Sequence, residues 1–361
     1  MTASPRLVSY IFVLLQLLAC GRGLGALAPN QLALATGATA SFAVVQDDLP
    51  APLPNAGSRH SGRPLVGSEG LLLADTAYNR LLSYAPLPGR AGARFRAVIG
   101  QPDAIRVVAG SDRGSFHGPT AISSDGQHLL IADPGNDRVL VFIGTGLTPG
   151  AQALRILGQG DSSHGCTSST LKGPSSAIIV GNFLAVADSG NNRVLMWLHF
   201  PTSDNIAADV VIGQPNMTTC TPTFGPQAMN QVSDIFFDNQ HLVVASPDNG
   251  GTVQLWRTLP TLNALPSNTQ LTHIGAGPLS LTANSSQLFV ADAHTNRVFI
   301  YNDFFVGLQP PSQPSAVLGQ PNAQQTGAGS GLAEMAAPQG LTLFGQQLWV
   351  NDAGNNRLLV F

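Results

Sequence analysis

An aspartate and an arginine recur five residues apart along most of the sequence. The pairs are Asp75 and Arg80, Asp133 and Arg138, Asp188 and Arg193, Asp292 and Arg297, and Asp352 and Arg357. A ring of such groups is a candidate site for a charged ligand, because carboxylates and guanidinium groups form charge-assisted hydrogen bonds. The stretches DPGND and DSGNN also offer oxygens to calcium, but their spacing is not that of an EF-hand loop and the adjacent arginine would repel the ion.

One copy of the pattern lacks these residues. Ser246 and Thr252 stand where the other copies have Asp and Arg, and Ala276 stands where the others have Gln. The loop after Ala276 is also lost, with two residues to Pro278 where other copies have 15 to 18. Because all four features disappear together, we predict that the Asp and Arg residues are structural turn anchors. Arginine suits this role since its five donors in a fixed fork can bind the backbone carbonyls of an overlying loop.

The shortened loop predicts an asymmetry. It leaves a notch in the rim of the molecule, bordered by Leu271–Pro278 and Asp248–Gly251. We predict that a partner or ligand binds at this notch, because binding sites are concave.

Residues suited to catalysis or metal binding are few. A zinc enzyme needs about three protein ligands and an open fourth position. The candidates near the predicted innermost strands are His117 and Asp234, with His60, at positions that are not equivalent, and no HxH or HxxxH pair occurs. There is no GxSxG elbow, P-loop or CxxC motif either. The sequence therefore predicts no catalytic residue and requires no cofactor, and it leaves open whether a metal binds.

The Asp and Arg residues lie within a longer repeat that predicts strands. The repeat reads LLIADPGNDRVLVF from Leu129 and LAVADSGNNRVLMW from Leu184, and six copies follow one another at steps of 46 to 60 residues. Each copy has two nearly continuous apolar runs around a polar cluster, which indicates a hairpin covered on both faces. One further apolar run precedes each hairpin, and another, ending in Gly-Gln, follows most of them. Four short strands per unit and six units predict an all-β, six-bladed β-propeller.

The two ends of the repeat region are expected to meet. The last copy stops at Phe361, after its third strand, and would leave an open sheet edge. The segment SFAVVQDD from Ser41 resembles RAVIGQPD from Arg96, which belongs to a fourth strand. We therefore predict that a strand at about 41–46 completes the last blade, and that the propeller spans 41–361.

The amino-terminal segment predicts export. Residues 1–20 combine one cation with an apolar stretch too short to span a bilayer comfortably, as in a signal peptide. The ending LLAC resembles a bacterial lipobox, so Cys20 is the predicted site of lipidation and 21–40 the predicted tether. The alternative is an ordinary export signal cut near Gly25 or Ala28. The expected location is the outer membrane, as a lipoprotein, or the periplasm or cell surface.

Two further cysteines and the charge balance add constraints. Cys166 and Cys220 lie in equivalent loops of neighbouring repeats, and in an oxidising compartment we predict a disulfide between them, the alternative being two separate thiols. Charged residues make up 10% of the chain and the net charge is −3, so no basic surface for nucleic acid is expected.

The hairpin motif, with Asp at its start and Asn-Arg four and five residues later, resembles the NHL repeat from about Ser41 to Phe361. The appended Gly-Gln element and the lipobox make the chain similar to exported bacterial NHL-repeat proteins. The resemblance implies a six-bladed propeller but no single function, since one fold hosts many. We expect a monomeric, extracytoplasmic recognition propeller that binds an unknown protein or small ligand and has no catalytic activity. The alternative is a metal-dependent lyase or lactonase-type hydrolase acting in the central channel.

Overall fold

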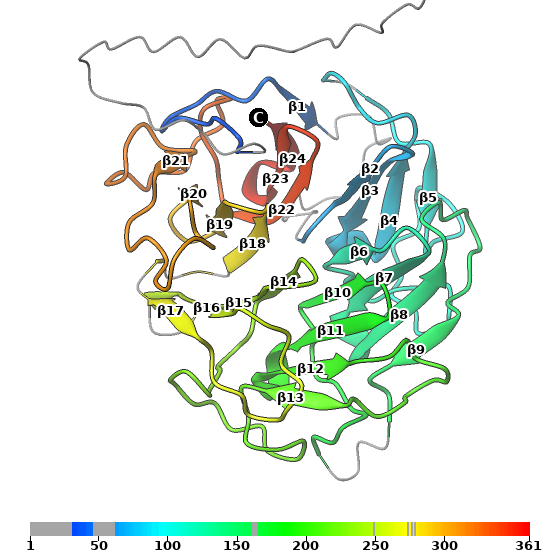
Figure 1. The fold of residues 1–361 in the computed structure, drawn as a ribbon. Helices are drawn as coiled ribbons and strands as arrows, with labels where there is room; N and C mark the ends of the chain where they lie inside the picture. Colours follow the sequence, from blue (N-terminus) through cyan, green and yellow to red (C-terminus); the bar gives the residue numbers. More distant parts are fainter. Residues whose placement is uncertain are drawn as a thin grey trace, which may run out of the picture.

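The chain folds into six antiparallel sheets of four strands each, arranged around a common centre (Figure 1). The computed structural model describes residues 31–45, 62–91, 93–160, 165–247, 250–272, 274–275, 277 and 279–361. The predicted all-β, six-bladed propeller is confirmed. Within each sheet, or blade, the strands are hydrogen-bonded in sequence order, and blade 6 is completed by the first strand of the chain.

The strands of the blades are short, as expected for apolar runs bounded by turns. Blade 1 contains β2 (Leu65–Gly67), β3 (Gly70–Asp75), β4 (Arg80–Tyr84) and β5 (Ala97–Ile99). Blade 2 contains β6 (Ile122–Ser124), β7 (His128–Asp133), β8 (Arg138–Ile143) and β9 (Arg155–Leu157). Blade 3 contains β10 (Ser176–Val180), β11 (Phe183–Asp188), β12 (Arg193–Trp197) and β13 (Val210–Ile212).

The other three blades follow the same plan. Blade 4 contains β14 (Asp234–Phe237), β15 (Leu242–Ser246), β16 (Thr252–Trp256) and β17 (Thr269–Thr272). Blade 5 contains β18 (Leu279–Ala283), β19 (Leu288–Asp292), β20 (Arg297–Tyr301) and β21 (Ala316–Leu318). Blade 6 contains β22 (Pro338–Phe344), β23 (Gln347–Asp352), β24 (Arg357–Val360) and β1 (Phe42–Val45).

The predicted closing strand is confirmed. β1 pairs antiparallel with β24, from Phe42 opposite Val360 to Val45 opposite Arg357. Figure 1 shows the blue β1 beside the red β24. Blade 6 thus takes three strands from one end of the propeller sequence and one from the other, which leaves no blade with a missing outer strand.

The hydrophobic core lies between the blades. The described part of the chain contains six clusters of buried side chains, and each joins two neighbouring blades. One example is the cluster between blades 2 and 3, in which Leu130 and Val141 of one sheet meet Leu184 and Trp197 of the next. Both faces of each sheet are therefore covered, which explains why the second and third strands read as continuous apolar runs.

The two ends of the propeller are built from different connections. On the end called here the turn face, the second and third strands are joined by tight turns. Loops on the same face lead from outer strands to the next blade, and they are long after β5, β9, β13 and β21 but short after β17. Four of these turns contain a short 3₁₀ segment: η1 (Thr76–Tyr78), η2 (Pro134–Asn136), η4 (Ser189–Asn191) and η6 (Ala353–Asn355). The opposite end, called here the hairpin face, carries the connections between first and second and between third and fourth strands.

Part of the predicted tether lies against the propeller. Of the predicted tether at 21–40, residues 31–40 are described. They lie beside β21, the outer strand of blade 5. The Gly37 N–H donates to the Val317 carbonyl at 2.9 Å, and the Val317 N–H donates to Thr36 Oγ1 at 3.2 Å. Within the described ranges, no helix has the length and apolar character needed to cross a membrane. The predicted signal peptide and Cys20 lie outside these ranges.

Candidate functional site

The repeated Asp and Arg residues form buried pairs across the second and third strands. Arg80, Arg138 and Arg193 each donate from Nε to Oδ2 of Asp75, Asp133 and Asp188 at 2.7–2.8 Å, and Arg357 donates to Asp352 in the same way at 2.7 Å. In blades 2 and 3 both side chains of the pair are fully buried. A ligand arriving at the surface would therefore not meet these charges.

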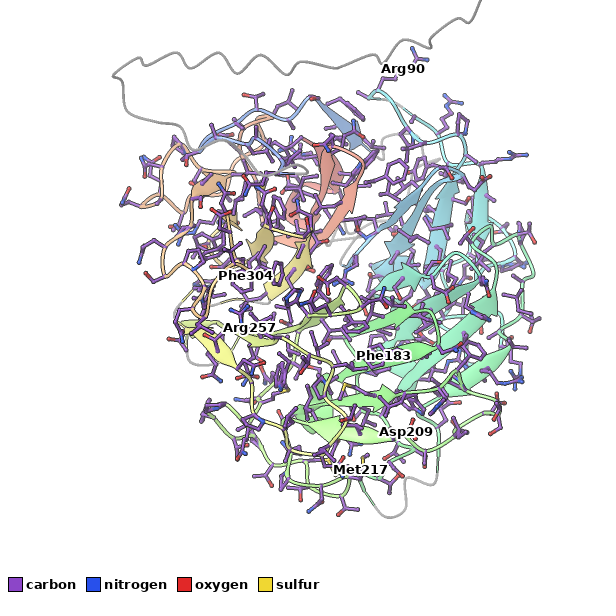
Figure 2. The ribbon with its side chains drawn as sticks, viewed as in Figure 1. Arg90, Phe183, Asp209, Met217, Arg257 and Phe304 are labelled. Carbon is purple, nitrogen blue, oxygen red and sulfur yellow. A yellow bond between two sulfur atoms is a disulfide. The ribbon has the colours of Figure 1, made fainter. Side chains whose placement is uncertain are left out.

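The guanidinium groups bind the loops of the turn face. In blade 3, Arg193 donates to the carbonyls of Thr167 and Thr170, which lie in the loop before the blade, at 2.8 and 2.9 Å. It also donates to the Met217 carbonyl, in the loop after the blade, at 2.5 Å. Met217 is labelled in Figure 2, near the lower edge of the view. One side chain thus holds two loops to one turn.

The residue before the arginine links neighbouring blades, and it is Asn79, Asn192 and Asn296 in blades 1, 3 and 5 and Asp137 in blade 2. Asn192 adopts a left-handed backbone conformation with φ of 55°, which Asn tolerates better than most residues. Its side chain accepts from the Gln231 N–H of the loop leading into blade 4 and donates to the Cys220 carbonyl, both at 2.9 Å. Gln214, of the Gly-Gln element, donates to the carbonyls of Asn192 and Thr221. We call this set of Asp, Asn, Arg and Gln contacts the turn network.

The buried carboxylates of the turn network are costly to ionise. Burial raises the pKa of Asp133, Asp188 and Asp352 above the ordinary value, although Arg, Asn and a backbone N–H donate to each of them and oppose the rise. A buried charge of this kind is tolerated only when it is paired and fully hydrogen-bonded.

Blade 5 has a looser version of the network. Arg297 donates from Nε to Thr295 Oγ1 at 2.9 Å, and Thr295 donates in turn to Asp292 at 2.5 Å. Of the two loops that flank the blade, Arg297 bonds the following one, through the Ala323 carbonyl. The loop that precedes blade 5 is the shortened one, which explains why carbonyls equivalent to those of Thr167 and Thr170 are not bound here.

In blade 4 a glutamine takes over the part of the arginine. Gln254, two positions beyond Thr252, donates to the carbonyls of Gly225 and Ala228 at 3.1 and 3.4 Å. These carbonyls lie in the loop before blade 4, at the positions that Thr167 and Thr170 occupy before blade 3. The loop is therefore still held, but by a neutral and shorter side chain.

A cavity occupies the position of the missing pair and loop. It measures about 290 Å³, and we call it the blade 4 cavity. Its polar lining consists of Ser246, Thr252, Gln254, Gln270 and Thr272, and Phe224 lies at its edge with 67% of its surface exposed. These lining side chains offer hydroxyl and amide groups, without a carboxylate, an imidazole or an amine.

The predicted borders of the notch are only partly described. Gly250, Gly251, Leu271 and Thr272 are described, whereas 248–249, 273, 276 and 278 lie outside the described ranges. Within the described part, the Gly275 N–H donates to the Gly250 carbonyl at 2.9 Å, so the shortened loop packs directly on the turn of blade 4.

An ion pair spans the central cavity. Arg63 reaches from the start of blade 1 and donates to Asp234 Oδ1 of blade 4 at 2.7 Å. It also donates to the carbonyls of Ile235 and Leu281, while Ser280 donates to Asp234 Oδ2 at 2.8 Å. The cavity beside this pair measures about 290 Å³. First strands and the residues just before them line it, together with Ser189 and Pro247 from turns between second and third strands. Both carboxylate oxygens of Asp234 thus accept hydrogen bonds from within the chain.

The candidate metal ligands are not brought together. His117 is exposed in the loop before blade 2, where its backbone N–H donates to Asp133 Oδ1 at 2.6 Å, and it does not line the central cavity with Asp234. His60 lies outside the described residues. Elsewhere in the described part of the chain, no group of three His, Cys, Asp or Glu residues is placed to hold a metal ion.

Cys166 and Cys220 are joined by a disulfide, with their Cα atoms 6.5 Å apart. The bond connects the loops before and after blade 3, which are the loops that Arg193 also holds. The Cys220 carbonyl accepts from Asn192, so the disulfide lies next to the turn network of this blade.

Sequence reasoning missed two of these residues. Arg63 is a single arginine at the start of a first strand, and nothing in the repeat marks its partner in blade 4. Gln254 is detectable in principle, since it is a polar residue inside the third strand of the one repeat that lacks Asp and Arg.

Comparisons with known proteins identify no family for this chain. No protein-family model matches the sequence, and no curated protein matches it. Among solved structures, the WD40 β-propeller domain of Doa1 is similar over 90% of this chain and 96% of its own, at 10% identity and a TM-score of 0.48. The computationally designed Ika8 protein is similar over 90% and 99%, at 10% identity and 0.44. Hsv2 of Kluyvelomyces marxianus is similar over 81% and 68%, at 8% identity and 0.41.

Proposed function

We propose that this chain is an exported recognition propeller of the NHL type that binds a neutral, hydroxyl-rich ligand at the blade 4 cavity and has no catalytic activity of its own. The observation that carries the proposal is the exchange in blade 4. A buried ion pair and its loop are replaced by an open cavity that keeps hydrogen-bonding groups and loses the ionisable ones.

The lining suits a saccharide. Hydroxyl groups and amides both donate and accept, so they match sugar hydroxyls without imposing a charge. The exposed Phe224 ring at the edge offers an apolar surface on which the less polar face of a sugar ring can pack. Binding of this kind needs orientation and desolvation but no proton transfer.

Two side chains of the cavity test this proposal. Neutral oligosaccharides on an array should include at least one that binds the purified propeller, and both Phe224→Ala and Gln270→Ala should weaken this binding by about tenfold or more. Leu262→Ala is the matched control, because Leu262 is as exposed as Phe224, at 67%, but lies on the hairpin face. If no neutral saccharide binds, or if both cavity variants bind like the parent, the proposed function is wrong.

The competing enzyme hypothesis makes a different prediction. A metal-dependent lyase or lactonase-type hydrolase would retain a stoichiometric metal, and His117→Ala would remove it. We expect elemental analysis of the purified propeller to find no stoichiometric zinc or calcium, since Arg63 neutralises Asp234 and His117 lies elsewhere.

Export and lipid anchoring form the cellular part of the proposal. The signal-like 1–20 segment, the lipobox ending at Cys20 and the disulfide support it, because disulfides persist in oxidising compartments. Cys20→Ser should release the protein from the membrane fraction of a bacterial host into the soluble periplasmic fraction. An unchanged distribution would contradict lipidation at Cys20.

A further inference from the structure

The junctions between blades on the hairpin face share a common construction. Two sequence positions are equivalent at these junctions: the residue at or just before the start of the second strand, and a residue in the loop after the third strand of the following blade. Occupants of the second position are Leu87, Phe200, Leu259 and Phe304, which are all apolar. These side chains fill the space that opens where two twisted sheets diverge.

Among the described residues, three junctions contain a pair of aromatic rings in contact, one stacked and two tilted. His128 of blade 2 stacks on Phe200 of blade 3, with ring centroids 4.1 Å apart. Between blades 4 and 5, His241 packs on Phe305 at 4.5 Å. Phe183 of blade 3, labelled in Figure 2, packs on Phe237 of blade 4 at 4.6 Å.

The junctions beside blade 6 are closed by other means. Blade 6 takes its fourth strand from the amino-terminal side, so it has no loop after its third strand to cover blade 5. Leu32 and Leu34 pack there instead, and Leu32 exchanges backbone hydrogen bonds with the Gln287 side chain. Between blades 6 and 1, Phe344 packs in one cluster with Leu87 and Phe95.

The junction between blades 1 and 2 is the exception. Gly70 stands at the first position and Thr145 at the second, so neither supplies an apolar side chain. Gly70 has a φ of +141°, and a Cβ there would lie 2.0 Å from the Tyr84 carbonyl oxygen, so the backbone itself excludes a side chain. The result is an open groove of about 770 Å³, which we call the blade 1–2 groove.

The groove has an apolar floor and two opposite charges. Leu65, Leu72, Tyr84 and Leu147 line it, together with Glu69 and Arg96. Glu69 and Arg96 are both exposed, so they are available to a molecule that enters the groove. Its volume is within the range of sites that bury a ligand or a large side chain.

We propose that the blade 1–2 groove is a docking site for a partner protein that inserts an aromatic side chain, from a segment that also carries one basic and one acidic residue. Two other junctions indicate the occupant, because Phe200 and Phe305 each place a ring from a loop against the equivalent position there. Glu69 and Arg96 supply the charge complementarity for the flanking residues. Buried aromatic anchors of this kind dominate the energetics of many interfaces.

A short peptide provides the probe. Acetyl-Lys-Phe-Glu-amide should bind the propeller, and acetyl-Lys-Ala-Glu-amide should bind about tenfold more weakly or not measurably, as followed by NMR titration. Thr145→Phe places a ring at the position equivalent to Phe200 and should abolish peptide binding while the thermal midpoint stays equal or rises. Thr145→Ser is the matched control and should bind like the parent.

A second variant guards against a folding defect in the first. Arg96→Ala changes an exposed side chain and should weaken the binding of the Phe peptide but not alter the thermal midpoint. Equal binding of the two peptides, or full binding to Thr145→Phe, would overturn the proposal. Free phenol binding as tightly as the peptide would also overturn it, in favour of a small-molecule site. Saccharide binding at the blade 4 cavity should be unchanged in all these variants, so the two proposals can fail separately.

Discussion

Each arginine of the turn network serves the backbone, although its repeated spacing suggests a binding ring. Arg193 shows the reason, since four of its five N–H groups donate to one carboxylate and three loop carbonyls from both sides of the blade. Lysine has no such fork and could not reach all of these acceptors at once. The same geometry makes the residue expensive to remove, because the partners are buried.

Arg193→Ala should therefore lower the free energy of unfolding by about 3–5 kcal/mol, the usual cost of breaking a buried pair. Chemical denaturation of the purified propeller measures this loss. Arg106→Ala is the control. Arg106 is 65% exposed and forms a long ion pair with Asp103, at 3.8 Å, so its loss should change the denaturation midpoint little. Equal effects of the two changes would contradict the structural role.

The loss in Arg193→Ala should also depend on pH. Without its cation, buried Asp188 has a pKa raised further, so the native state binds a proton at a pH where the unfolded chain does not. The stability of the variant then rises relative to the parent as the pH falls from about 7 to about 5. If the difference in the free energy of unfolding between parent and variant stays constant or widens over this range, Asp188 is not the source of the lost stability.

At the scale of elements, β1 determines whether blade 6 is complete. It supplies the outer strand, and Val44, 4% exposed, packs in the cluster between blades 6 and 1 with Trp349 and Val360. The strand is bound on only one side, through its pairing with β24, so its attachment depends on this packing and on that ladder.

Val44→Asp should destabilise the whole propeller, because it buries an unpaired charge in this cluster. We expect a loss of about 3 kcal/mol or more in the free energy of unfolding, together with faster proteolysis at the amino-terminal side. Ser41→Asp, at an exposed position next to the same strand, should have little effect. A stable Val44→Asp variant would mean that β1 contributes little to closing the ring.

At the scale of the whole molecule, repetition made the fold predictable and exceptions made the sites hard to predict. Six copies of one pattern determine the number of blades, and the likeness of Ser41–Asp48 to a fourth strand predicts the closure that β1 makes. The defective copy at Ser246 indicates the notch for the same reason. Arg63 and Asp234 could not be paired from the sequence, because the distance between blades 1 and 4 across the centre follows only from the closed ring.

The blade 1–2 groove corresponds to two unusual residues in the sequence, which become meaningful only once the fold places them together. Gly70 and Thr145 differ from their equivalents in the other repeats, but they lie 75 positions apart, in different blades. Only the structure shows that the two positions face the same junction. Comparing the repeats one position at a time detects a side chain that is missing within a blade. A contact that is missing between blades is detected only when pairs of positions from neighbouring repeats are compared.

The pairing of β1 with β24 has a consequence for the order of events during synthesis. Phe42 and its partner Val360 are separated by 318 residues, so the ribosome makes one strand long before the other. At about 5–20 residues per second, this delay amounts to roughly 15–60 s, during which blades 1 to 5 are translated but the ring cannot close. A chain in that state exposes an unpaired strand and an apolar blade face, which are features that promote aggregation. The topology therefore sets a minimum time during which the incomplete ring has to be protected.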